Sequence, residues 1–374
     1  MKERSDNQPW LTFPQEPSGS SPSSLPAAPA AAGPSPRPQR TWTAVLALYF
    51  LAPLIAELLT GSTPPLMWND VGGIILTTGL YGSGAILARE LVRRRGLSWG
   101  HLALLGVAYG VLEEGMAFQS WFNPTWADPP DRLRFLEINW MLVLVFTTIH
   151  VTLSIMSSVV IAQALFPQQA ERPWLGRKAL GGLALWLLLI TSWLFVSYGF
   201  LIYRGKGYDH PPVTYGIALV LFVLFLWLGL HRRKASASAQ ADSGDPLRPA
   251  PRLWTVRLAA FVAAFVVLVN LFFLRNLIPI ALIPFGIVAG VDLLSVLLVR
   301  RWAKRSGWGV RHRLALVSGV IGVFIVASPF FEFVIPRQPG HNPTGLTLVD
   351  LCALGGLIWL AWRVKRQEGF MKPR

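Results

Sequence analysis

Ten stretches of this sequence are long and apolar enough to cross a lipid bilayer as helices, and they constrain the fold more than any other feature. Backbone polar groups inside lipid have no water to bond, so α-helices are the default for such stretches. The sequence therefore predicts an all-α fold, a polytopic transmembrane helix bundle. The expected spans are residues 42–60, 68–88, 99–120, 138–165, 179–202, 212–230, 254–274, 278–299, 314–335 and 346–362.

The composition agrees with a membrane location. Of the 374 residues, 53% are hydrophobic and only 14% are charged, whereas a soluble domain carries roughly a quarter charged residues. This deficit of charge excludes a disordered chain, a coiled coil and an ordinary soluble enzyme. The single cysteine, Cys352, excludes an intrachain disulfide and a zinc site built from cysteines.

The distribution of positive charge predicts the topology. The formal net charge is +15, and the cations lie between the apolar stretches rather than on one basic domain. If the spans alternate in direction, 28 of the 34 Lys and Arg residues fall on one side and six on the other. Short cytoplasmic loops carry such an excess, so both termini are expected to be cytoplasmic. Membrane lipids are the expected surroundings, and no nucleic-acid partner is expected.

The sequence divides into three predicted regions. Residues 1–40 are rich in Pro, Ser and Ala and are expected to form a disordered cytoplasmic tail. Residues 41–364 form the predicted transmembrane domain, with a flexible cytoplasmic loop at 232–252. Residues 365–374 form a short basic cytoplasmic tail.

Adjacent carboxylates in the third span are the first candidate site. Ionisable side chains at membrane depth are costly, which makes them functional candidates. On a helical wheel Glu113 shares a stripe with Gly106, Gly110 and Ala117, and Glu114 lies at the edge of that stripe. Because two neighbouring carboxylates repel each other at low dielectric, they suit a general acid/base or a proton carrier. The alternative is that both are neutral and only join helices.

The fourth span carries the only histidine well inside a predicted helix. Asn139 and Ser154 lie within about 40° of His150 on a helical wheel, and Thr147 lies about 60° away, so a polar stripe follows this helix. The third and fourth spans run antiparallel in the predicted topology, which allows Glu113 and His150 to meet. We expect Glu113, Glu114 and His150 to be catalytic. Asn139, Thr147 and Ser154 are expected to contact substrate.

Other acids are scattered through the spans. Asp292 lies near the middle of the eighth span and is the strongest additional candidate, as a substrate-binding or ion-carrying residue. The remaining acids lie nearer helix ends, where a side chain can reach water. They are Glu57, Asp70, Glu332 and Asp350.

Two short motifs, Glu113-Glu114 and Phe146-Thr-Thr-Ile-His150, resemble those of the CPBP (Abi, or CAAX-type) intramembrane protease family. That family has EExxxR on one helix and FxxxH on the next. Glu113-Glu114 resembles the start of the first motif, and Phe146-Thr-Thr-Ile-His150 resembles the second in letters, spacing and order. The resemblance implies a Glu/His site that activates water for peptide cleavage within the membrane. Phe118 stands where the first motif has arginine, and no third-motif histidine follows His150.

Three functions stay open at this level. The first is an intramembrane hydrolase, with Glu113 or Glu114 as the base and His150 as its partner. The second is a proton- or ion-coupled secondary transporter of two five-helix halves, suggested by a weak likeness between residues 106–111 and 286–291. The third is a scaffold whose polar groups only pack helices. The sequence identifies no metal ligand set, cofactor, substrate or protein partner. A cell-membrane protein, of the prokaryotic inner-membrane kind, is expected.

Overall fold

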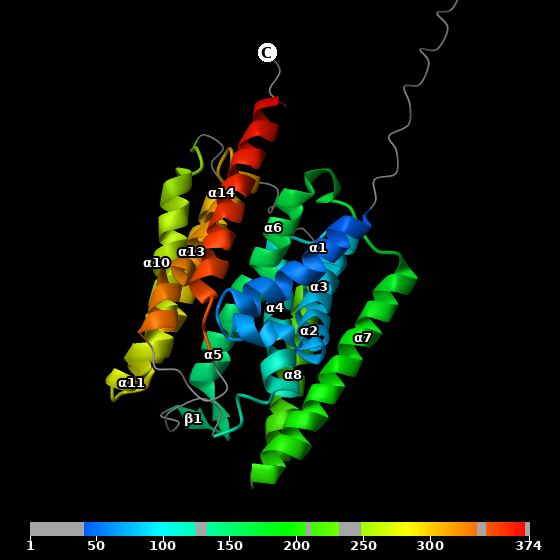
Figure 1. Ribbon diagram of the computed structural model, residues 1–374, viewed down its shortest axis with the longest axis vertical. Coiled ribbons are helices and arrows are strands. Elements are labelled where there is room, and N and C mark those ends of the chain that lie inside the picture. The colour runs from blue at the N-terminus through cyan, green and yellow to red at the C-terminus, as the bar shows by residue number, and fades with distance from the viewer. Residues whose placement is uncertain (1–40, 125–132, 207–210, 232–247, 335–341, 371–374) are drawn as a thin grey trace, which may run out of the picture. The chain divides into compact units, whose positions relative to one another are not determined.

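The computed structural model describes residues 41–124, 133–206, 211–231, 248–334 and 342–370 (Figure 1). The predicted tail 1–40 lies outside these residues, as does most of the predicted loop 232–252. Nearly all of the described chain is helical.

All ten apolar stretches form helices, which confirms the all-α polytopic prediction. Eight of the described helices are long and apolar enough to span a membrane. The other two are a shorter apolar helix, Trp42–Leu58, and the helix Trp99–Ala117, which carries Glu113 and Glu114. The helices and their segments are α1 (Trp42–Pro53) with η1 (Leu54–Leu58); α2 (Val71–Thr77), η3 (Thr78–Gly82) and α3 (Ser83–Arg95); α4 (Trp99–Gly110) with η4 (Val111–Ala117); α5 (Trp140–Ile149), η5 (His150–Ser157) and α6 (Ser158–Leu165); α7 (Arg177–Val196) with η7 (Ser197–Tyr203); α8 (Pro212–Leu230); α10 (Leu253–Val269), η9 (Asn270–Leu274) and α11 (Arg275–Leu277); α12 (Leu282–Ala303); α13 (Val310–Phe333); and α14 (Leu346–Phe370).

The remaining elements are short. Three 3-10 turns join helices, namely η2 (Pro65–Asn69), η6 (Pro167–Gln169) and η8 (Arg204–Lys206). Strands β1 (Arg134–Phe135) and β2 (Ile138–Asn139) pair antiparallel and lead into α5.

Side-chain caps fix where several helices begin. Asp70, one of the scattered acids, accepts hydrogen bonds from the backbone N–H of Gly72 (3.2 Å) and Gly73 (2.8 Å) and so caps α2. Asn139 caps α5 by accepting a hydrogen bond from the Leu142 N–H at 3.2 Å. Both residues sit at helix starts because a short side-chain acceptor satisfies amides that the helix itself leaves unpaired.

Small residues bring α4 and η5 close together. A Cβ atom added at Gly106 would lie 3.2 Å from the Val151 Cα, and one at Gly110 would lie 3.4 Å from the His150 Cβ. No heavy atom of the described chain comes within 4 Å of the same position at Gly286 or Gly290. The two motifs that suggested an internal repeat therefore differ in packing.

The arginines after the second span join neighbouring helices at one end of the bundle. The buried guanidinium of Arg89 donates hydrogen bonds to the carbonyls of Gln169, Ala170 and Arg172 and lies 3.4 Å from the centre of the Trp174 ring. We call these contacts the Arg89 clip. Because loops after the second and fourth spans meet here, these two cation-rich loops share one end, as the alternating topology predicts.

Candidate active site

The candidate residues lie on segments with π-helical hydrogen bonding. Glu113 and Glu114 belong to η4, and His150 begins η5. Two neighbours come from further π-helical segments, Glu57 from η1 and Tyr81 from η3. Short π-helical turns occur often at functional sites, where the wider turn re-aims side chains. Four such turns therefore supply one polar cluster inside an otherwise apolar bundle.

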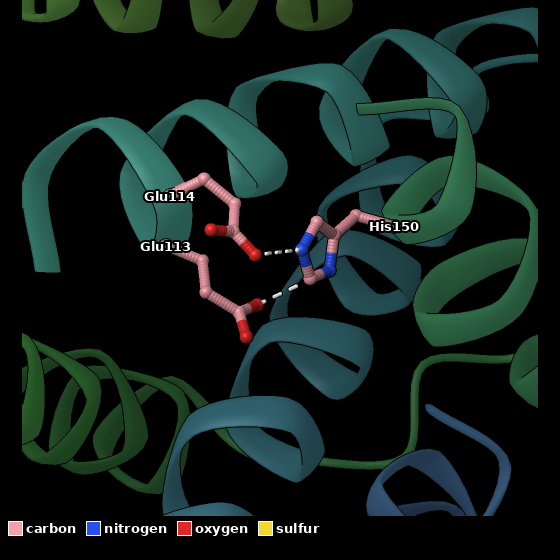
Figure 2. A group of neighbouring side chains, drawn as sticks. All are labelled: Glu113, Glu114 and His150. Atoms are coloured by element: carbon pink, nitrogen blue, oxygen red, sulfur yellow. Dashed lines mark hydrogen bonds and ion pairs between the residues drawn. The ribbon is translucent and has the colours of Figure 1, made fainter. Parts of the chain in front are cut away.

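Figure 2 shows Glu113 and Glu114 approaching one imidazole from the facing helix. The His150 Nε2 lies 2.9 Å from Glu114 Oε1, and its Nδ1 lies 3.3 Å from Glu113 Oε2. The three side chains are buried, with exposed fractions of 0% for Glu113, 9% for Glu114 and 4% for His150. The three predicted catalytic residues therefore lie together. The His150 imidazole has two carboxylates beside it in a buried environment, where charges interact more strongly than in water.

Two serines hold Glu114 and His150 in place. The Ser120 hydroxyl donates a hydrogen bond to Glu114 Oε2, and the Ser154 Oγ lies 3.1 Å from His150 Nδ1. Ser120 belongs to the chain just after η4, whereas Ser154 lies one turn after His150 on η5. The orientations of Glu114 and His150 are therefore fixed from both sides of the pair.

Glu113 differs from Glu114 in its hydrogen bonding. The Glu113 carboxylate makes no hydrogen bond of standard geometry with the described residues, but its Oε2 lies 3.3 Å from His150 Nδ1 and it interacts with the Tyr81 and Tyr109 hydroxyls. The Tyr109 hydroxyl is buried beside Glu113 and likewise makes no hydrogen bond of standard geometry with the described residues. Leaving a buried polar group unpaired costs roughly 1–3 kcal/mol, so such groups call for an explanation. The unused acceptors of Glu113 can receive a water molecule, a substrate group or a proton.

Tyrosines and a third acid extend the cluster towards the end opposite the Arg89 clip. Tyr81 donates a hydrogen bond to Glu57 Oε1, and Thr63 donates one to Glu57 Oε2 at 2.6 Å. The Tyr81 and His150 rings are nearly parallel, with centroids 6.2 Å apart, and the Tyr109 ring lies edge-on to His150 at 5.8 Å. Glu57 and Tyr81 thus link the buried Glu113, Glu114 and His150 cluster to the partly exposed turn that contains Thr63.

The sequence contained a signal for Glu57 and Tyr81 that spacing alone did not resolve. Glu57 was one of the scattered acids, and Tyr81 shares a helical face with Asp70. Neither pattern reveals that η1 and η3 pack beside η5. Ser120 lies beyond the end of its helix, so helical periodicity gives no information on it.

The predicted substrate-binding residues separate into different environments. Ser154 contacts His150, whereas Asn139 caps α5. Thr147 lies where α5 passes Gly110. Asp292 accepts a hydrogen bond from Thr148 at 2.6 Å, in the contact between α12 and α5. Of these four, only Ser154 is hydrogen-bonded to the candidate catalytic residues.

The departure from the first CPBP motif has a structural counterpart. Phe118, in the position of the motif's arginine, packs edge-to-face on Tyr198 with ring centroids 5.0 Å apart. Gln119 follows with a φ of +57°, and its buried amide accepts a hydrogen bond from the Tyr215 hydroxyl and donates one to the Phe195 carbonyl. The left-handed backbone at Gln119 ends the helix and turns the chain over the site.

The same three residues could hold a divalent cation. One ligand atom from each of Glu113, Glu114 and His150 lies within 4.8 Å of the others. Two carboxylates and an imidazole form a donor set of the kind that zinc and other divalent transition metals accept. No metal was predicted, because the sequence offered no third ligand; two adjacent glutamates on one turn supply it.

Comparison with known proteins gives a family without an assigned activity. The sequence model of an uncharacterised membrane protein family matches residues 46–365. No curated protein and no solved structure matches the chain. The matching family is not the CPBP family, so the resemblance of the two short motifs stays a prediction.

Proposed function

The chain belongs to this uncharacterised membrane protein family, and from its Glu113–His150–Glu114 cluster we propose that it is an intramembrane hydrolase that cleaves peptide bonds within the bilayer. The observation that carries the proposal is the approach of both carboxylates to one buried imidazole, from helices that the two motifs had paired. Contacts of 2.9 Å from Glu114 and 3.3 Å from Glu113 to the His150 ring nitrogens gather three titratable groups at one point, which suits acid–base catalysis.

Each residue has a role in the proposed reaction. Glu113, whose oxygens make no hydrogen bond of standard geometry with the described residues, acts as the base. It takes a proton from a water molecule while the water oxygen attacks the carbonyl carbon of the peptide bond. His150, whose Nε2 is bonded to Glu114 and whose Nδ1 lies beside Ser154 and Glu113, acts as the polar partner that holds the two carboxylates in position. The peptide C–N bond then breaks, and the proton held by Glu113 passes to the leaving nitrogen. Water is consumed, and a carboxylic acid and an amine are formed.

The experiment uses the full chain reconstituted in proteoliposomes. The probes are fluorescein-labelled casein and a panel of synthetic single-span peptides, with products identified by mass spectrometry. We expect Glu113→Gln to reduce product formation by at least about 100-fold, the usual contribution of a general base. Asp350→Asn is the matched control, because Asp350 is a buried acid on α14 outside the cluster. Unchanged cleavage by Glu113→Gln, or no product from the wild-type protein, would contradict the proposal.

One observation favours proton-coupled transport as a second candidate. The contacts from Thr63 through Glu57 to Tyr81 join the partly exposed turn to the vicinity of His150. Hydrogen-bonded acids of this kind carry protons in transporters. Asp292 lies in a separate contact between α5 and α12. In the transporter proposed here, Glu57 therefore takes the role of additional proton carrier that the sequence suggested for Asp292. If wild-type proteoliposomes carrying an internal pH dye dissipate a pH gradient, and Glu57→Gln liposomes do not, transport is favoured over hydrolysis.

We propose the same orientation for both functions. Both termini are cytoplasmic and the chain resides in the cell membrane of a prokaryote, with the tail 1–40, the loop 232–252 and the basic end 365–374 on the cytoplasmic side. The excess of cations on that side supports this orientation.

A further inference from the structure

A groove between α3 and α8 lies at the cation-rich end of the bundle, away from the acidic cluster. Its volume is about 770 Å³, within the usual range for a site that holds a small ligand. One end is lined by Arg94, Arg95 and His231, the residues at which the two helices finish. Because both helices are candidate spans, this end of the groove lies where a bilayer changes from acyl chains to headgroups.

The wall of the groove is apolar and comes from one face of α8. Val223, Leu226, Trp227 and Leu230 follow one another at helical spacing. Val223 and Trp227 are 54% and 55% exposed. Gly229, on another face, permits close contact between α8 and α4, since a Cβ there would lie 2.7 Å from a Leu105 methyl group. The wall is therefore held rigidly while its outer face stays open.

The two arginines at the end of the groove differ in how strongly other residues of the protein bind them. Arg94 is held by the Leu175 carbonyl and lies 3.5 Å from Glu90. Arg95 is exposed, and its hydrogen bond within the described chain is a long one, 3.4 Å to the Leu230 carbonyl. Its planar guanidinium carries five N–H groups that suit phosphate oxygens. His231 stacks on Trp227, with ring centroids 4.7 Å apart, and adds a further polar group beside Arg95.

We propose that this groove binds one anionic phospholipid of the cytoplasmic leaflet. The headgroup phosphate lies on Arg95 beside His231, and an acyl chain lies along the face of α8 that contains Val223 and Trp227. The assignment rests on the order of the lining: cations at the headgroup level and apolar side chains below them match the two ends of a phospholipid. Basic pockets between helices on the cytoplasmic side take anionic headgroups for the same reason. The inference is independent of the proposed hydrolase activity.

The test is lipid retention by the purified full-length chain, measured by native mass spectrometry. The chain is equilibrated with phosphatidylglycerol or with phosphatidylcholine, and thermal unfolding is followed in parallel. We expect one phosphatidylglycerol to be retained in preference to phosphatidylcholine. Arg95→Gln should lower the affinity for phosphatidylglycerol about fivefold, the usual effect of one basic residue at an anionic surface. Trp227→Ala should weaken retention of both lipids, because it removes part of the wall.

The matched control is Arg300→Gln, which removes an exposed arginine from the last turn of α12 without touching the groove. Equal loss of lipid from Arg95→Gln and Arg300→Gln would overturn the proposal, because it would mean a general charge effect. Equal retention of the two lipids by the wild-type protein would do the same. Inorganic phosphate is the remaining probe: if it raises the melting temperature as much as phosphatidylglycerol does, the site recognises a free anion and the lipid assignment fails.

Discussion

At the scale of single residues, the acidic cluster combines two kinds of carboxylate. Glu114 is held by Ser120 and His150, whereas Glu113 has the longer contact to His150 and weaker interactions with the Tyr81 and Tyr109 hydroxyls. A residue that only joins helices would be expected to use its hydrogen-bonding capacity, as Glu114 does. The unequal bonding of adjacent, chemically identical side chains is the strongest local argument against a purely structural role.

Removing the Tyr81 hydroxyl should break the hydrogen bond that connects Glu57 to the residues around His150. In Tyr81→Phe the ring beside His150 remains, but Glu57 loses a hydrogen-bond donor. We expect a loss of about 1 kcal/mol of stability, the usual contribution of one hydrogen bond. The measurement is chemical unfolding in detergent, with Glu57→Gln and the double variant completing a cycle. Additive effects of the two substitutions would show that the hydrogen bond contributes nothing.

The Glu113, Glu114 and His150 donor set predicts metal binding. We expect Co²⁺ added to the purified protein to bind in a 1:1 ratio, with a visible absorption band and an affinity that rises with pH, because protons compete for the same atoms. His150→Ala should abolish the band, while Asp292→Asn should leave it unchanged. An unaltered band in His150→Ala would place the bound metal elsewhere.

At the scale of elements, the site depends on the close approach of α4 to η5. A larger side chain at Gly106 would meet the backbone of Val151, whereas Gly286 faces open space. We therefore expect Gly106→Leu to cost about 1–3 kcal/mol, as overpacking does, and Gly286→Leu to have little effect. Melting temperatures of the two variants in one detergent provide the comparison. Equal melting temperatures would argue against this packing.

Helical periodicity predicted elements well and their irregularities poorly. Apolar length located all ten helices, and the polar stripes placed Glu113 and His150 on facing sides. Helical periodicity could not predict the π-helical turns, because a helical wheel drawn at 100° per residue assumes an unbroken α-helix. Those turns bring Glu57 and Tyr81 to the site. Asp70 and Asn139 cap α2 and α5, and the sequence could not show this because capping residues and site residues share the same chemistry.

At the scale of the whole molecule, the topology can be tested by labelling. In a Cys352→Ser background, Ser62→Cys lies in the turn near Glu57 and Ser306→Cys lies beyond the end of α12, and both serines are exposed. We expect a membrane-impermeant maleimide to label Ser62→Cys in intact cells and Ser306→Cys only after lysis. The reverse pattern would invert the proposed orientation.

The Arg89 clip has a consequence for how the site opens. Arg89 is buried and bound to three carbonyls, and Glu90 accepts hydrogen bonds from the Trp174 and Leu175 amides, so α3 and the loop after α6 are fastened at the end that the proposed orientation places in the cytoplasm. We therefore expect relative movement of these helices in the opposite half, which contains the π-helical turns and Glu57. In the proposed orientation that half faces away from the cytoplasm, so water entry and product exit in the proposed hydrolase should depend on the medium outside the cell, and a polar inhibitor should act without crossing the membrane.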